Sequence, residues 1–148
     1  MRIKKTSQYI EGGANLSNEY GTSNENGYTQ QYINNLETYS TDGVRIGIWK
    51  NGKPLYRKLI ETTIPTTSTD GTFAYNETSL GTTNEFTLIE WGYFVDIGSI
   101  LPIPYFTNSG YSTKAFLLDA NTLRINNSNS SWNGKNASIS ILYTKITD

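Results

Sequence analysis

The chain has 148 residues, with 12 basic and 13 acidic side chains and a formal net charge of -1. This length suits one compact domain, and the near balance of charge gives no electrostatic basis for binding nucleic acid or an anionic membrane. The sequence contains neither cysteine nor histidine, so disulfides, thiolate chemistry, and the commonest general base and metal ligand are excluded. No apolar run approaches the about 20 residues of a membrane-spanning helix. We therefore expect no membrane insertion, no cofactor and no bound metal.

Small polar residues and tyrosine dominate the composition. The chain holds 20 Thr, 16 Asn and 14 Ser beside 13 Gly and 11 Tyr. Threonine and tyrosine fit pleated strands, whereas asparagine, glycine and serine fit turns. Alanine is scarce and there is a single methionine, so long helices are disfavoured. The composition predicts an all-β protein.

Residues 1–38 are predicted to form an N-terminal attachment or shaft segment. The stretch EGGANLSNEYGTSNENG has the composition of turns and loops. In the following YTQQYINNLETY, Tyr32, Ile33 and Leu36 are spaced to share one face of a short helix, and Thr29 can cap its start. An isolated helix of this length is marginal in water. We therefore expect it to pack on a partner, such as the same helix in a neighbouring copy.

Residues 39–148 are predicted to form a head domain that opens with a hairpin. Val44, Ile46 and Ile48 alternate with other residues at the period of a strand, and Asn51-Gly52 predicts a two-residue type I′ turn. Such a turn places Ile48 opposite Leu55 and Ile46 opposite Arg57. The guanidinium group of Arg57 would then interrupt an apolar face, so it must reach water at an edge, a carboxylate or backbone carbonyls.

The remaining strands follow in chain order. Alternation in FTLIEWGYFVDIGSI predicts a strand whose core-facing set is Ile89, Trp91, Tyr93, Val95 and Ile97. The two prolines of LPIPYF place that segment at an edge or bulge. TKAFLLDANTLRIN predicts a hairpin that turns near residues 119–121, and ASISILYTKIT predicts the final strand. Seven or eight strands joined by polar loops predict an antiparallel β-sandwich of jelly-roll-like form.

Catalytic patterns in the sequence are weak. Glycoside hydrolysis needs two carboxylates about 5–10 Å apart. Glu90 and Asp96 share a strand face but lie about 20 Å apart, at roughly 3.3 Å per residue, although carboxylates from distant strands could still meet. We predict no catalytic residues and no enzymatic activity.

Sugar binding needs aromatic rings that stack on apolar sugar faces, and amide groups that bond the hydroxyls. Both kinds of side chain occur in loop-like surroundings late in the chain. The candidate glycan-binding residues are Tyr105, Asn108, Tyr111, Trp132 and Asn133. The alternative is that each ring only plugs the end of the sandwich.

Several segments together resemble a known family. VRIGIWKNGKPLYRKLI resembles the segment W-x-[DN]-G-K-P-[LI]-Y-R-K that recurs in tail-fibre and head-fibre proteins of phages. YINNLETYST, IEWGYFVDIGSILPIPYF, NTLRINN and SISILYTKITD match further pieces of the same domain in the same order, so the resemblance covers roughly residues 39–148. The chain departs from the family at Thr41-Asp42-Gly43, where relatives tend to carry longer acidic or Gln-containing runs.

The resemblance implies a non-enzymatic, homotrimeric fibre module on the virion surface, on the head or the tail, that meets a host cell-surface glycan. Residues 1–38 would then bind other virion proteins. The family has no fixed set of binding residues. The hairpin motif is expected to set the strand register and the subunit contact through Trp49, Asn51, Gly52, Pro54, Tyr56, Arg57 and Lys58. Arg57 and Lys58 could pair with Glu61 or Glu90 of a neighbour. Two alternatives are a purely structural capsid, tail or fibre-assembly protein, and a polysaccharide depolymerase.

Overall fold

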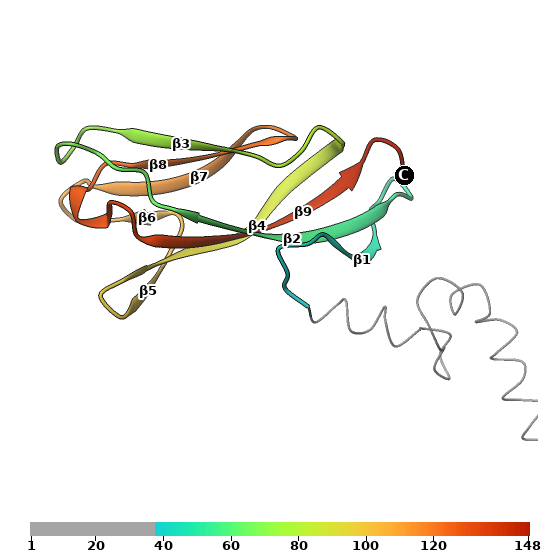
Figure 1. Ribbon diagram of the computed structural model, residues 1–148, viewed down its shortest axis with the longest axis horizontal. Helices are drawn as coiled ribbons and strands as arrows, with labels where there is room; N and C mark the ends of the chain where they lie inside the picture. The colour runs from blue at the N-terminus through green and yellow to red at the C-terminus, as the bar shows by residue number, and fades with distance from the viewer. Residues whose placement is uncertain (1–37) are drawn as a thin grey trace, which may run out of the picture.

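The structure, a computed structural model, describes residues 38–148 as an all-β domain of two antiparallel sheets (Figure 1). The predicted N-terminal helix and attachment segment lie outside the described residues, apart from Thr38. Five strands form one sheet in the order β1-β2-β9-β4-β5, and four form the other in the order β3-β8-β7-β6. The strands are β1 (Val44–Ile48), β2 (Pro54–Thr63), β3 (Ala74–Ser79), β4 (Asn84–Asp96), β5 (Ser99–Pro102), β6 (Tyr105–Phe106), β7 (Ser112–Asp119), β8 (Thr122–Asn127) and β9 (Asn136–Lys145), with a 3-10 turn η1 at Ser130–Trp132.

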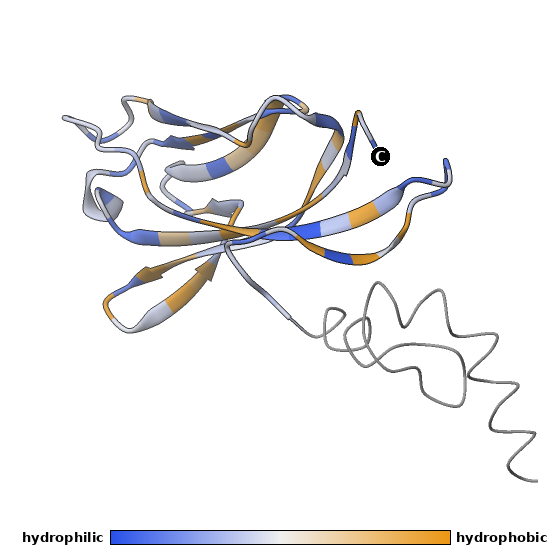
Figure 2. Ribbon diagram, turned by 45° about the vertical axis from the view of Figure 1, so that its right-hand side comes forward, coloured by the Kyte–Doolittle hydropathy of each residue, from blue (hydrophilic) through white to orange (hydrophobic). Residues whose placement is uncertain are grey.

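The core lies between the sheets. Alternation along the strands sends one set of side chains inward, and hydrophobic and polar residues accordingly alternate along many strands in Figure 2. The buried hydrophobic residues are Ile60, Ile64, Leu80, Phe94, Ile103, Leu123, Ile125, Trp132, Ala137, Ile139, Ile141 and Tyr143. Strand β9 contributes every second residue from Ala137 to Tyr143, so it is the central strand of the core. The predicted all-β fold with two packed sheets is confirmed.

The first hairpin exists, but its predicted register is wrong. The Trp49 N–H donates to the Lys53 carbonyl at 2.8 Å, and the Gly52 N–H donates to the Trp49 carbonyl at 2.8 Å. These bonds enclose a three-residue loop, and Gly52 takes the required left-handed conformation with φ 88°. Together with an irregularity between Arg45 and Gly47, the extra residue pairs Val44 with Arg57 and Ile48 with Pro54. Arg57 therefore does not face Ile46.

A second irregularity in β4 overturns the predicted core set. Ile89 pairs with Ile141 and Trp91 pairs with Ser140, so Glu90 is an extra residue that shifts the alternation by one. After it, Phe94 points into the core and is fully buried, while Val95 is 40% exposed. Trp91, Tyr93 and Val95 consequently lie on the outer face. Ile97 occupies the β4–β5 turn and is 91% exposed, so only Ile89 of the predicted set packs against the core.

The later predictions hold better. The hairpin formed by β7 and β8 turns at residues 120–121, where the Asn121 N–H donates to Asp119 Oδ1 at 2.7 Å. The proline-bearing segment forms the edge strand β5 and the short β6, as Pro102 and Pro104 predict. Among residues 38–148, no helix is long and apolar enough to cross a membrane.

Candidate functional site

The predicted glycan-binding residues do not form a common surface. Trp132 is only 4% exposed, and its ring contacts Phe94 at 5.4 Å and Tyr105 at 5.6 Å between ring centroids. Tyr105 in turn packs edge-on against Phe94 at 6.2 Å. A sugar cannot stack on a ring already enclosed by others. The position of the Trp132 ring therefore favours the alternative, that the ring plugs the end of the sandwich.

Asn133 joins two loops rather than facing solvent. Its Oδ1 accepts hydrogen bonds from the Thr67 N–H at 2.9 Å and from Asn127 Nδ2 at 3.1 Å, and its Nδ2 donates to the Thr67 carbonyl at 2.6 Å. Thr67 and Asn127 are buried, so these bonds satisfy groups that water cannot reach. The side chain therefore has a structural role, which leaves its amide little capacity to bind a sugar.

Tyr111 and Asn108 belong to the loop before β7. The Thr107 N–H donates to the Tyr111 carbonyl at 2.9 Å, and the Tyr111 N–H donates to Thr107 Oγ1 at 3.1 Å. This tight loop leaves Tyr111 half-buried against the core and Asn108 exposed. Of the five predicted glycan-binding residues, only Asn108 is therefore fully exposed to solvent.

The hairpin residues have structural contacts within the chain. Trp49 stacks on Phe86 at 5.0 Å between centroids, and Tyr56 stacks on Tyr143 at 5.4 Å. Pro54 begins β2, and Asn51 Oδ1 accepts a hydrogen bond from the Lys53 N–H at 3.1 Å. Lys58 pairs with Ile141 across β2 and β9 and is partly buried. These contacts agree with a role in setting the register.

Arg57 is paired inside the chain. Its Nε and one terminal nitrogen donate to the two oxygens of Glu90, at 3.1 and 2.9 Å, and the Arg57 side chain is 11% exposed. Ser140 Oγ donates to the same carboxylate at 2.8 Å. Burial alone would raise the pKa of Glu90, but the hydrogen bonds from Arg57 and Ser140, with the guanidinium charge, hold that pKa below its usual value. The predicted pairing of Arg57 with a neighbour is therefore not required.

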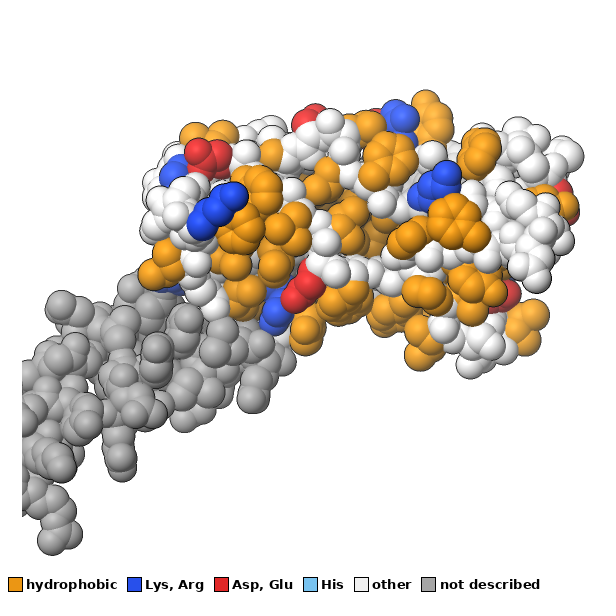
Figure 3. All heavy atoms as spheres, turned by 180° about the vertical axis from the view of Figure 1, so that it is seen from behind, with side chains coloured by type: hydrophobic (Ala, Val, Ile, Leu, Met, Phe, Trp, Pro, Cys, Tyr) orange, Lys and Arg blue, Asp and Glu red, His pale blue; other side chains and the backbone are white. Residues whose placement is uncertain are grey.

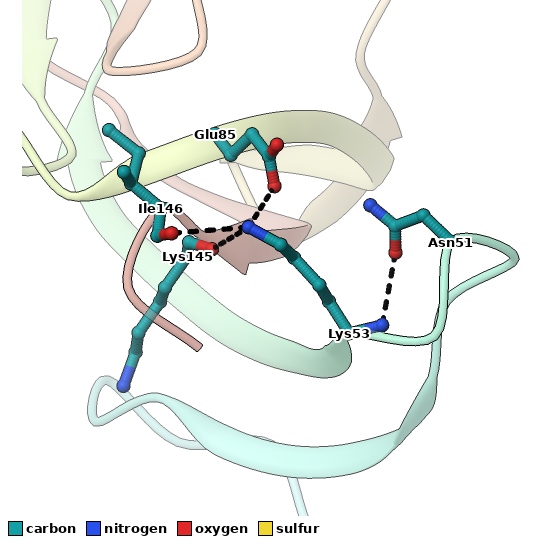
Figure 4. A network of polar contacts seen from close by, with 5 residues as sticks. All are labelled: Asn51, Lys53, Glu85, Lys145 and Ile146. Atoms are coloured by element: carbon teal, nitrogen blue, oxygen red, sulfur yellow. Dashed lines mark hydrogen bonds and ion pairs between the residues drawn. The ribbon is translucent and has the colours of Figure 1, made fainter.

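The sequence analysis missed Lys53, which fastens the hairpin loop to the end of the chain (Figure 4). Its ammonium group donates to the carbonyls of Lys145 and Ile146, both at 3.1 Å, and lies 2.7 Å from Glu85. Three acceptors match the three donors of the ammonium group. The sequence does contain a sign of this contact. Lys53 follows Asn51-Gly52 directly, and the start of a strand does not otherwise need a charged residue.

The outer face of the four-stranded sheet carries a row of exposed aromatic side chains, here called the aromatic face. Tyr75 and Phe106 are each 60% exposed and Phe116 is 37% exposed. Strand pairing aligns Tyr75 on β3 with Asn126 on β8 and Lys114 on β7, and aligns Glu77 with Arg124 and Phe116. The rings thus span the sheet from β3 to β6, about 14 Å at roughly 4.8 Å per strand.

Cations lie over two of these rings. The Arg124 guanidinium is 4.3 Å from the centre of the Tyr75 ring and also pairs with Glu77. The Lys114 ammonium lies 5.6 Å from the centre of the Phe106 ring. Figure 3 shows Lys and Arg side chains set among hydrophobic ones over this part of the molecule. The aromatic face offers ring surfaces beside hydrogen-bond donors, which is the combination that the sequence analysis sought elsewhere.

Several of the acidic groups in the described part of the chain are engaged by cations or local hydrogen bonds. Asp96 pairs with Lys135 at 3.2 Å, and hydrogen bonds from the hydroxyl and N–H of Ser130 lower the pKa of Asp70. Among residues 38–148, no cluster of three or more acidic side chains could hold a metal ion.

Comparisons with family models, with curated proteins and with solved structures find no match to this chain.

Proposed function

We propose that the chain is a trimeric fibre module of a virion, jelly-roll-like in its head, that binds a host cell-surface glycan without cleaving it. The fibre assignment rests on the sequence resemblance of residues 39–148. The binding assignment rests on the aromatic face, where Tyr75, Phe106 and Phe116 are exposed beside Lys114 and Arg124.

The chemistry of the aromatic face supports a sugar ligand. The C–H groups on one side of a pyranose ring form an apolar surface that suits the negative face of an aromatic ring. Donors from Lys114, Arg124 and Asn126 lie between the rings and can bond the hydroxyl or carboxylate groups of the sugar. The rings sit on paired strands, so binding needs little ordering of the protein.

Depolymerase activity has less support from the geometry. A glycosidase needs one carboxyl group with a raised pKa as general acid. In Glu90 and Asp70 the pKa is instead lowered, by Arg57 and Ser140 in the first case and by Ser130 in the second. Both groups therefore remain carboxylates at neutral pH.

A structural decoration protein is the second candidate, favoured by a different observation. The outer face of the five-stranded sheet exposes Val95 and Ile100 by 40 and 71%, and the adjoining β4–β5 turn exposes Ile97 by 91%. Exposed aliphatic side chains are typical of protein contacts rather than of sugar contacts. A virion protein can carry both kinds of surface.

Glycan arrays with the full chain test the proposal. We expect binding to one class of host wall or capsular glycan, weakened about tenfold or more by Tyr75→Ala and by Phe106→Ala, which corresponds to about 1.4 kcal/mol. Tyr39→Ala removes a ring that is 49% exposed on the other sheet and should leave binding unchanged. If the chain binds none of the host glycans, the structural decoration protein is favoured. If new reducing ends form when the chain is incubated with host polysaccharide, a depolymerase is favoured. A native mass other than three times that of the chain in light scattering would refute the trimer.

A further inference from the structure

The outer face of the five-stranded sheet is apolar along β4 and β5, and we call this surface the β4 face. It comprises Leu88, Trp91, Tyr93, Val95 and Ile100, which the strand pairing and the irregularity at Glu90 place on the same side. The rings of Trp91 and Tyr93 stack at 5.8 Å. The β4–β5 hairpin extends beyond the sandwich and carries hydrophobic residues along its length (Figures 1 and 2). Soluble proteins seldom leave a continuous surface of this kind uncovered.

The described chain begins on this surface. The Ser40 carbonyl accepts a hydrogen bond from the Leu59 N–H at 2.7 Å, which fixes the incoming backbone beside β2. The ring of Tyr39 then reaches over the sheet, 5.6 Å from Trp91 and 4.5 Å from the guanidinium of Arg57. The residues that precede Tyr39 are thus tethered at the margin of the β4 face.

The sequence before Tyr39 has the pattern that such a surface needs. Tyr32, Ile33 and Leu36 share one face of the predicted helix, and Tyr39 continues the same stripe at the seventh position after Tyr32. Gln30, Gln31, Asn34 and Asn35 supply the polar side. We propose that residues 29–38 of the same chain pack as a helix on the β4 face, with Tyr39 on Trp91 as the last contact of the stripe.

The dimensions agree with this packing. The proposed helix extends about 9 Å from Tyr32 to Thr38. From Trp91 to Val95 the strand extends about 13 Å, so the stripe, with Tyr39 on Trp91, reaches most of the way from Trp91 to Val95. The β4 face also compensates for the low stability of a short helix in isolation.

The same chain is favoured over a second copy by proximity. Leu36 is three residues from Tyr39, whose position is fixed, so its effective concentration at the β4 face is in the millimolar range expected of a short tether. The segment of another copy has no such short tether to this β4 face. Near the centre of the surface, Arg57 and Glu90 are already paired with each other, and Glu61 accepts a hydrogen bond from Ser138 Oγ at 2.9 Å.

Disulfide trapping in the full chain tests this proposal, because the sequence has no cysteine of its own. The test pair is Leu36→Cys with Tyr93→Cys, and the matched control is Asn35→Cys with Tyr93→Cys. We expect the test pair to form an intrachain disulfide at least tenfold faster than the control under mild oxidation, because Leu36 lies on the apolar stripe and Asn35 on the polar side.

Two results would overturn the proposal. Equal rates for the two pairs would mean that the segment is tethered but not docked. Predominantly intermolecular disulfides would mean that another copy covers the β4 face. A second measurement is independent of cysteine geometry: Leu36→Asp should lower the unfolding midpoint, whereas Asn35→Asp should not, and equal midpoints would likewise overturn the packing. None of these outcomes depends on glycan binding.

Discussion

The irregularity at Glu90 can be tested by two adjacent substitutions, Phe94→Ala and Val95→Ala. Without the extra residue, simple alternation from Ile89 would place Val95 in the core and Phe94 outside it. With it, Phe94 is fully buried against Tyr105 and Trp132, and Val95 is 40% exposed. Simple alternation predicts the larger loss of stability for Val95→Ala, whereas the structure predicts it for Phe94→Ala. Comparing the two losses therefore shows which face each residue occupies.

The two substitutions should lower the free energy of unfolding by amounts that differ severalfold. Truncation of a buried phenylalanine to alanine costs about 3–5 kcal/mol of stability. The cost has two parts, the lost transfer free energy of the ring and the cavity that the ring leaves behind. Val95→Ala removes two methyl groups from a partly exposed site and should cost less than about 1 kcal/mol. Since small domains are stable by about 5–15 kcal/mol, Phe94→Ala should remain foldable but shift the urea midpoint strongly. Urea unfolding followed by circular dichroism measures both, and a larger loss for Val95→Ala would refute the assigned register.

Three further outcomes are expected. Asn133→Ala should lower the free energy of unfolding in urea by about 1–3 kcal/mol, because the buried Thr67 amide loses its acceptor. Asn108→Ala, in an exposed loop, should lower it by less than about 0.5 kcal/mol. Equal losses would contradict the structural role of the Asn133 hydrogen bonds. The lowered pKa of Glu90 means that its stabilising contribution is present above its ordinary pKa, about 4.3, and is lost as the pH falls below it. Glu90→Gln should therefore show a shallower loss of stability in acid than the native chain, and identical pH profiles would refute this. Gly43→Ala should lower the melting temperature, because the added methyl group would overlap the hydroxyl of Tyr143, whose ring is held by stacking; an unchanged melting temperature would show that the ring can move.

The sequence predicted where strands lie far better than which way their residues face. Alternation in the segments around Val44, Ile89 and Ile141 located β1, β4 and β9 because period-two patterns are local. One extra residue reverses every later side chain, and such residues occur next to Gly47 and two positions before Gly92. Glycine inside a strand is a known sign of such irregularities, but it does not say which residue is extra.

The candidate site was misjudged for a related reason. Asparagine and serine around Trp132 have the composition of an exposed loop, yet Asn127, Asn129 and Asn133 use their amides to bond backbone and side-chain groups where the loop closes over the core. The sequence does not show whether such an amide faces water or a buried carbonyl. The aromatic face was missed because Tyr75 and Phe116 lie within strands, where aromatic residues are usually taken for core.

The two outer faces differ in chemistry, and this difference bears on how the domain can work. The face of the four-stranded sheet sets rings beside hydrogen-bond donors, so a hydrated ligand that exchanges with water can bind there. The face of the five-stranded sheet sets aliphatic and indole groups around an ion pair already closed by Arg57 and Glu90, and only a partner that excludes water gains from it. A domain covered on one side by its own N-terminal segment presents the other side outward.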